Sequence, residues 1–214
     1  MSRIRVHNLL VSLDGFAAGP DQSQSAPMGV GGERLSAWFW ETHVGRSMIG
    51  QSGGSTGIDN DWLERADKNV GATVMGRNMF GPIRGEWPDD SWVGWWGDEP
   101  PYHHPVFVLT HHARGDLSMA GGTTFHFVTD GLDSALQRAV EAAQGKDVRL
   151  GGGVATVREA LRRGLVDEID IAIVPTLLGS GERIWDDLGT WPEGYVCTQI
   201  QSSDSVVHLQ FCRA

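Results

Sequence analysis

The chain has 214 residues, of which 40% are hydrophobic and 21% are charged, and its formal net charge at pH 7 is −10. This composition is typical of a globular protein, and the length fits one domain over residues 1–214. The acidic balance and the lack of a long basic run argue against binding of nucleic acid or an anionic membrane, although a local arginine cluster could still hold a small anion. No apolar run approaches the ~18 residues of a membrane span, so we expect a cytoplasmic protein.

The first third of the chain predicts one strand, two helices and long loops. Residues 4–13 alternate loosely and are rich in branched apolar side chains, which favours a strand. Residues 17–32 are rich in glycine, proline, serine and glutamine, so a loop is predicted there. Apolar residues at helical spacing predict a helix over 33–44. Residues 45–58 indicate a second loop, and a helix is predicted over 61–67, with Asp59 or Asn60 as its cap.

A short buried strand is predicted over 72–76, followed by a turn or the start of a helix at 77–80. The long segment 81–104 then holds four of the nine tryptophans, namely Trp87, Trp92, Trp95 and Trp96. A loop of that length inside a compact domain is usually functional or mobile. Two interpretations stay open at this point. The tryptophans either pack the loop down as a satellite cluster or form an aromatic wall for a flat ligand.

Strands and helices alternate over the rest of the chain. Strands are predicted at 105–110, 124–128, 147–150 and 169–174, and helices at 132–143 and 154–163. Such alternation implies parallel crossovers with helices on the sheet faces. The runs 195–201 and 206–212 form a closing hairpin, and we expect their cysteines, Cys197 and Cys212, to be reduced. The predicted fold is therefore α/β, with a central, mostly parallel mixed sheet flanked by helices and a C-terminal antiparallel hairpin.

Three of these strands end in groups that suit the phosphates of a nucleotide cofactor. The groups are Gly76, Arg77 and Asn78; Thr110, His111 and Arg114; and Gly151, Gly152 and Gly153. Helix N-termini present unpaired N–H groups, arginines add charged donors, and glycines let a pyrophosphate lie against the main chain. Neither common phosphate-loop pattern is present, so the interpretation depends on the three strand ends together.

The same segments occur in the order seen in a known superfamily. They are VSLDGF at 11–16, TVMGR at 73–77, VFVLT at 106–110, LGGG at 150–153 and PTLLGSG at 175–181. With this set the chain resembles the dihydrofolate-reductase-like proteins, and most closely the C-terminal reductase domain of the bifunctional riboflavin-biosynthesis deaminase–reductase. The resemblance covers nearly the whole chain, least well at 17–72 and 81–104. It is specific to the superfamily and does not identify a substrate.

The resemblance implies an NADPH-dependent reductase that transfers hydride to a small heterocycle, pterin-like or flavin-precursor-like, or to another C=N or C=O substrate. The implied cofactor contacts are Gly76, Arg77, Asn78, Thr110, His111, Arg114, Leu150, Gly151, Gly152, Gly153, Val154, Ala155 and Thr156. The strand end before Arg114 matches the place where relatives bind the adenosine 2′-phosphate, which favours NADPH over NADH. The family also often has a cis peptide within the glycine run. His111 could instead be a plain solvent-facing loop residue.

The resemblance also places substrate contacts. They are Asp14, Gly15, Phe16, Trp96, Pro175, Leu178 and Gly179. Hydride transfer to a C=N bond needs a proton donor, and Asp14 matches the family's active-site carboxylate, so it is the predicted catalytic residue. It could orient the substrate instead, or simply form an Asp-Gly turn. Dihydrofolate reductases proper carry their acid on the helix before the Met-Gly-Arg strand, where this chain offers Glu41, Asp61 and Glu64.

Other classes of function remain open from the sequence. The H-x-E and P-C-x-x-C motifs of the zinc deaminases are lacking, so we expect a stand-alone reductase domain and no metal site. One alternative is a non-catalytic or sensor protein that holds an aromatic small molecule, and another is an oxidoreductase that uses flavin or deazaflavin. The expected partner is a small-molecule substrate, and the exposed edge of the closing hairpin predicts a homodimer.

Overall fold

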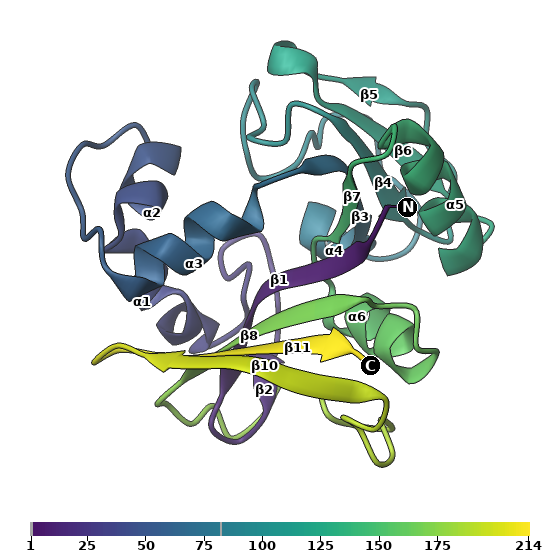
Figure 1. Ribbon diagram of the computed structural model, residues 1–214. Coiled ribbons are helices and arrows are strands. Elements are labelled where there is room, and N and C mark those ends of the chain that lie inside the picture. Colours follow the sequence, from purple (N-terminus) through teal and green to yellow (C-terminus); the bar gives the residue numbers. More distant parts are fainter. Residues whose placement is uncertain (1, 82) are drawn as a thin grey trace.

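A computed structural model describes residues 2–81 and 83–214, and its centre is a nine-stranded sheet (Figure 1). The spatial order is β10-β11-β8-β1-β7-β3-β4-β6-β5. The strands are β1 (Ile4–Ser12), β3 (Val70–Gly76), β4 (Pro105–Leu109), β5 (Leu117–Ser118), β6 (Thr124–Val128), β7 (Asp147–Leu150), β8 (Glu168–Val174), β10 (Tyr195–Ser202) and β11 (Val207–Arg213). From β8 to β6 in this order all neighbours are parallel, whereas β5, β10 and β11 pair antiparallel. The predicted fold is confirmed.

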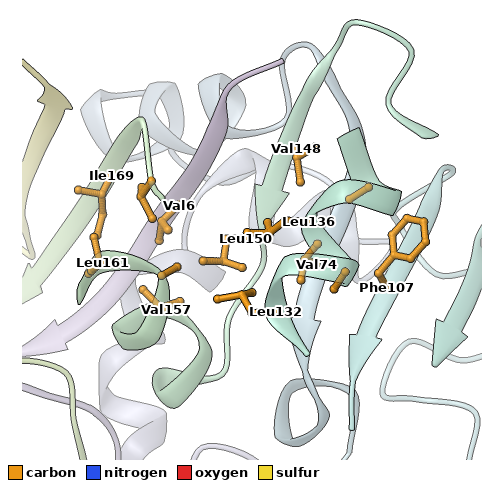
Figure 2. Packing of buried hydrophobic residues seen from close by; sticks show 14 of the residues in the cluster. Val6, Val74, Phe107, Leu132, Leu136, Val148, Leu150, Val157, Leu161 and Ile169 are labelled. Atoms are coloured by element: carbon orange, nitrogen blue, oxygen red, sulfur yellow. The ribbon is translucent and has the colours of Figure 1, made fainter. Parts of the chain in front are cut away.

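Helices cover both faces of the sheet. Leu132 and Leu136 of α5 (Leu132–Ala142) and Val157 and Leu161 of α6 (Val154–Arg162) point toward the buried side chains of β1, β3 and β7 (Figure 2). The short helices η1 (Gly32–Leu35), α1 (Ala37–Trp40), α2 (His43–Met48) and α3 (Ile58–Ala66) belong to the other face. On β8, Ile169 and Ile171 join the first core and Ala172 and Val174 the second. This alternation places the two cores on opposite faces, as strand geometry requires.

The prediction of one continuous helix over 33–44 is wrong. The chain instead forms η1, α1 and α2, and α2 includes residues that read as loop in the sequence. Thr42 is extended, with ψ of 163°, and its hydroxyl accepts the N–H of Gly45 at 3.0 Å. A Cβ on Gly45 would lie 2.1 Å from the carbonyl oxygen of Phe39, so the corner depends on a close backbone approach. Such tertiary contacts override helical spacing.

A second, two-stranded sheet joins the two loops that follow β1 and β8. It consists of β2 (Phe16–Ala18) and β9 (Glu182–Arg183), which the sequence did not indicate. The segment between α4 (Arg77–Phe80) and β4 contains no helix or strand among its described residues, as predicted. Both cysteines are free thiols, also as predicted. No helix within the described ranges has the length and apolar character that crossing a membrane requires.

A buried ion network joins the amino ends of three central strands. Arg5 of β1 is 4% exposed and contacts Asp147 of β7 at 3.1 Å and Glu168 of β8 at 3.0 Å. Arg3 donates to the same two carboxylates, and Arg5 also donates to the carbonyl oxygen of Lys68. Because a buried charge is costly without its partner, these contacts fix the strands at the end opposite their carboxyl termini. The carboxyl ends are thereby left for a ligand site.

We expect Arg5→Leu to lower the free energy of unfolding by about 3 kcal/mol, because it leaves two buried carboxylates short of a partner. Urea denaturation followed by circular dichroism measures the change. The matched control is Arg138→Leu, which breaks a solvent-exposed pair with Asp130 of the same length, 3.0 Å, and should cost less than about 1 kcal/mol. Equal losses in the two variants would show that the network does not hold the strands.

Candidate functional site

A cavity of about 1060 Å³ lies at the carboxyl ends of the central parallel strands. It contains every predicted cofactor residue except Arg114, namely Gly76, Arg77, Asn78, Thr110, His111 and the residues from Leu150 to Thr156. Of the predicted substrate residues only Trp96 lies in its wall. Three separate strand ends are therefore brought to one site, as the topology of parallel sheets predicts.

The glycine run owes its composition to a close approach of two backbones. The N–H of Gly151 donates to the carbonyl oxygen of Val74 at 2.8 Å, and the N–H of Gly76 donates to that of Gly152 at 3.0 Å. Gly152 and Gly153 have φ values of +125° and +84°. A Cβ on Gly153 would lie 3.2 Å from the Cα of Gly76. Both the conformation and the contact require glycine here.

The cis peptide expected within this run is not found. Among the residues that the structure describes, the one cis bond joins Trp191 and Pro192. Positive φ angles at Gly152 and Gly153 turn the chain instead.

Helix α6 begins directly after the glycines and presents its N-terminus to the cavity. Gly153 is the N-cap and offers no side-chain hydrogen bond to the first turn. Val154, Ala155 and Thr156 lie in the cavity wall. The first N–H groups of a helix lack intrahelical partners and carry partial positive charge, so this end suits an anion.

Arg77 provides the charged donor of the site. Its guanidinium carbon lies 3.8 Å from the ring centre of Trp87. Its Nε and Nη2 atoms are buried and make no hydrogen bond to any described residue. Partial burial of the guanidinium lowers the pKa of Arg77. Because unpaired buried donors are costly, this side chain is prepared for an anionic partner that the chain itself does not supply.

The segment after β4 divides between the cavity and the tryptophan loop. The Thr110 hydroxyl accepts the N–H of His112 at 3.1 Å, and exposed His111 lines the cavity. Arg114 does not reach the cavity. Its guanidinium donates to the carboxylate and carbonyl of Asp90 at 3.2 and 2.8 Å and to the carbonyl of Trp92 at 2.7 Å, and its side chain is 4% exposed. The structure thus gives Arg114 the role of fastening the 81–104 loop.

Both interpretations of the tryptophans apply. Trp87 and Trp92 donate their ring N–H groups to the carbonyls of His112 and Phe80 at 2.9 and 3.0 Å, and both pack on a small core that β3, β4 and β6 share with α4. Trp95 and Trp96 line the cavity, and Trp96 also packs on the same small core. Trp87 and Trp92 therefore hold the loop in place, Trp95 forms part of an aromatic wall, and Trp96 does both.

Asp14 anchors the loop that follows β8. Its carboxylate accepts hydrogen bonds from the Ser12 hydroxyl at 2.5 Å, the Gly179 N–H at 2.7 Å and the Leu178 N–H at 3.1 Å. The Ser12 hydroxyl, followed by the two amides, lowers the pKa of Asp14 to about 2. The group is therefore ionised at neutral pH in the absence of a ligand. Its catalytic role stays a prediction, and its contacts are those of a positioning residue.

The remaining predicted substrate residues lie beside Asp14 and not in the cavity wall. They are Gly15, Phe16, Pro175, Leu178 and Gly179. Glu41, Asp61 and Glu64 do not line the cavity either, and among described residues its carboxyl side chains come from Glu99 and Glu182.

Several residues of the cavity wall were not predicted from the sequence. Thr129 and Gly131 follow β6, and their position after a parallel strand was a usable signal. A larger set comes from the poorly matched segment 17–72, where no motif indicated them. It consists of Ala17, Ala18, Gln22, Pro27, Met28, Trp40, Met48 and Ile49.

One group of metal-ligand type occurs near the sheet. His7, Glu168 and Asp170 place a ligand atom each within 4.8 Å of one another. Glu168 is paired with Arg5 at 3.0 Å and Asp170 with Arg65 at 3.0 Å. The carboxylate charges are thus balanced by arginines, and the cluster reads as an ion network of the sheet.

The family profile of the RibD C-terminal domain matches residues 5–209. The chain belongs to this family. The resemblance stated from the motifs is therefore confirmed, and the family profile spans both poorly matched segments as well. No curated protein matches the chain.

Solved structures share the fold. A protein of Shewanella sp. PV-4 named for riboflavin biosynthesis is 19% identical with a TM-score of 0.60, over 100% of this chain and 99% of that one. The diaminohydroxyphosphoribosylaminopyrimidine deaminase/5-amino-6-(5-phosphoribosylamino)uracil reductase of Thermotoga maritima is 13% identical with a TM-score of 0.54, and this chain spans 57% of its length. Dihydrofolate reductase of Enterococcus faecalis, solved with NADP(H), is 13% identical with a TM-score of 0.50, over 99% and 96% of the two chains.

We expect Gly153→Ala to destabilise the protein more than Gly145→Ala. Both positions have positive φ, +84° and +86°, where an alanine is strained, and the ψ of 105° places Gly153 outside the left-handed helical region as well. A Cβ at Gly145 meets nothing within 4 Å, whereas one at Gly153 pushes on the backbone of Gly76. The extra loss, about 1 kcal/mol or more, is measured by urea denaturation. Equal losses of stability in the two variants would show that the close approach to Gly76 is not the reason for glycine at position 153.

Replacing Asp14 with alanine should release the loop after β8. Hydrogen–deuterium exchange at the Leu178 and Gly179 amides is expected to accelerate, because both lose their acceptor. The ordinary pKa is 3.8 and the folded value about 2, so the anchoring is complete above about pH 4 and is lost as the pH falls through about 2. Ser12→Ala, which keeps the carboxylate, should accelerate exchange less. Unchanged exchange in the Asp14 variant would contradict the assignment.

Proposed function

We propose that the protein is an NADPH-dependent reductase that transfers hydride to a small heterocyclic, pterin-like or flavin-precursor-like substrate, or to another C=N or C=O bond. The observation that carries the proposal is the meeting of three anion-binding elements in one cavity: the unpaired guanidinium of Arg77, the glycine turn, and the uncapped N-terminus of α6. Membership of the RibD C-terminal domain family and the fold shared with dihydrofolate reductase support it.

The residues fit a dinucleotide cofactor. The bare main chain of Gly151–Gly153 and the first turn of α6 would receive the pyrophosphate, and Arg77 would pair with a phosphate. Thr110, His111 and Asn78 line the same cavity and would complete the contacts. NADPH, when bound, would supply the hydride. The guanidinium of Arg114 already donates to Asp90 and Trp92. Arg114 would therefore act indirectly, by holding the loop that carries Trp95 and Trp96.

The substrate would lie beside β1 and the tryptophan wall. Asp14, which accepts the amides of Leu178 and Gly179, would position the loop after β8. Glu99 and Glu182 are the carboxyl residues of the cavity wall and are the proposed sources of the proton.

A homodimer remains a prediction. One feature of the structure supports it. Strand β10 lies at the edge of the sheet, and Val196 and Ile200 on it are 54% and 67% exposed. Unpaired apolar edges invite a partner strand.

The proposal is tested by calorimetric titration of the purified protein with NADPH and NADH. We expect NADPH to bind, and Arg77→Gln to weaken it about 10- to 100-fold, as loss of a charge-assisted hydrogen bond does. Arg138→Gln on the exposed face of α5 is the control and should bind as wild type does. Well-folded protein that binds neither dinucleotide would refute the proposal. A yellow protein as purified would favour the alternative with a bound flavin.

A further inference from the structure

One end of the cavity is apolar and comes from the chain between β1 and β3. Pro27, Met28, Trp40, Met48 and Ile49 line it. Trp40 lies in α1, Met48 lies in α2, and Ile49 directly follows α2. The two helices lie beside β1 on the side away from β4 and β6 (Figure 1). The anion-binding elements belong to β3, β4 and α6, so the two ends of the cavity differ in chemistry.

The apolar end exposes large side chains that a folded protein normally covers. Trp40, Met48 and Ile49 are 43%, 48% and 52% exposed. Ligand sites are mostly apolar with few polar groups, and methionine adapts its shape to irregular partners. Three such side chains gathered at the wall of one cavity are therefore explained by an apolar ligand group.

Hydrogen bonds hold this wall in place without a ligand. The Asn78 amide donates to the side-chain oxygen of Gln22 at 3.4 Å, and the Gln22 amide donates to the carbonyl of Pro27 at 3.0 Å. These bonds tie the loop before η1 to α4 within the cavity wall. Pro27 and Met28 are thus positioned in advance, which lowers the entropic cost of binding.

The same end offers no surplus of positive charge for a phosphate. Among the described wall residues the arginines are Arg77 and Arg84, and there is no lysine. Arg77 stands at the glycine turn. Arg84 donates to the side-chain oxygen of Asn78 at 2.5 Å and shares a smaller pocket of about 460 Å³ with Asp21 and Glu182. With two carboxyl residues and one arginine in its lining, this pocket has no excess of positive charge.

We propose that the substrate of this reductase is an uncharged heterocycle that carries an apolar arm, aromatic or branched alkyl, and no phosphate. Trp40, Met48 and Ile49 contact the arm, and among the described wall residues no arginine or lysine beyond Arg77 and Arg84 could pair with a phosphate on it. The inference rests on the proposed reductase function and specifies its substrate class.

The test compares two lumazines that differ only in the arm on N8, one benzyl and one ribityl 5-phosphate. Their affinities are measured by fluorescence, with and without saturating NADPH. We expect the benzyl compound to bind at least about tenfold more tightly, as apolar complementarity provides. Ile49→Glu should weaken the benzyl compound about tenfold or more by placing a charge in the apolar wall. NADPH affinity should stay unchanged in this variant.

Val140→Glu is the matched control, since Val140 is 39% exposed on α5 and does not line the cavity. It should leave both affinities unchanged. The neutral dye 1-aminoanthracene tests the apolar end independently of the heterocycle, with the same expected loss in Ile49→Glu. Tighter or equal binding of the phosphorylated lumazine overturns the proposal. So does failure of both the benzyl compound and the dye to bind.

The two proposals fail in different ways. Absence of NADPH binding with a retained preference for the benzyl arm would reject the reductase function alone. Binding of NADPH with no effect of Ile49→Glu on the benzyl compound would reject the apolar arm alone.

Discussion

The site depends on two backbone hydrogen bonds between the end of β3 and the glycine turn after β7. Gly151 donates to Val74 and Gly76 donates to Gly152, so the two parallel strands remain joined beyond their last regular pairs. Each strand end leads directly into a helix, and the starting points of α4 and α6 are therefore fixed relative to one another. A side chain at Gly153 would force these backbones apart. The position of Arg77 against α6 follows from this contact.

The sequence predicted the parallel core because its signals are local. Apolar runs at β3, β4, β7 and β8 and the helices between them leave few topologies, and parallel topology alone brings their carboxyl ends together. The groups that the Arg114 side chain contacts are decided by tertiary structure. It depends on carbonyls 22 and 24 residues away in an irregular loop, and no spacing rule locates them. The broken helix at Thr42 has the same origin, because helical spacing continues through a corner that only packing creates.

The apolar end of the cavity could not be predicted from the sequence, for a different reason. Trp40, Met48 and Ile49 have the pattern of residues that bury themselves in a core, and sequence cannot tell a buried apolar stripe from one that faces a cavity. Asp14 shows the converse difficulty. A carboxylate at a family position suggests chemistry, yet two amides and a hydroxyl hold it ionised. The hydrogen bonds decide which protonation state the group can use, and only the fold supplies them.

The charge of the protein constrains how an anionic cofactor can be held. With a formal net charge of −10 the long-range field opposes a dinucleotide phosphate, so attraction has to arise within hydrogen-bonding distance. The N-terminus of α6 and the half-buried Arg77, whose Nε and Nη2 atoms are buried, act at this range, where low solvation strengthens them. At the apolar end the described wall adds one arginine, Arg84, whose pocket also contains Asp21 and Glu182, so the negative field of the whole protein disfavours an anion there as well. An apolar, neutral partner is the ligand that this electrostatic arrangement admits there.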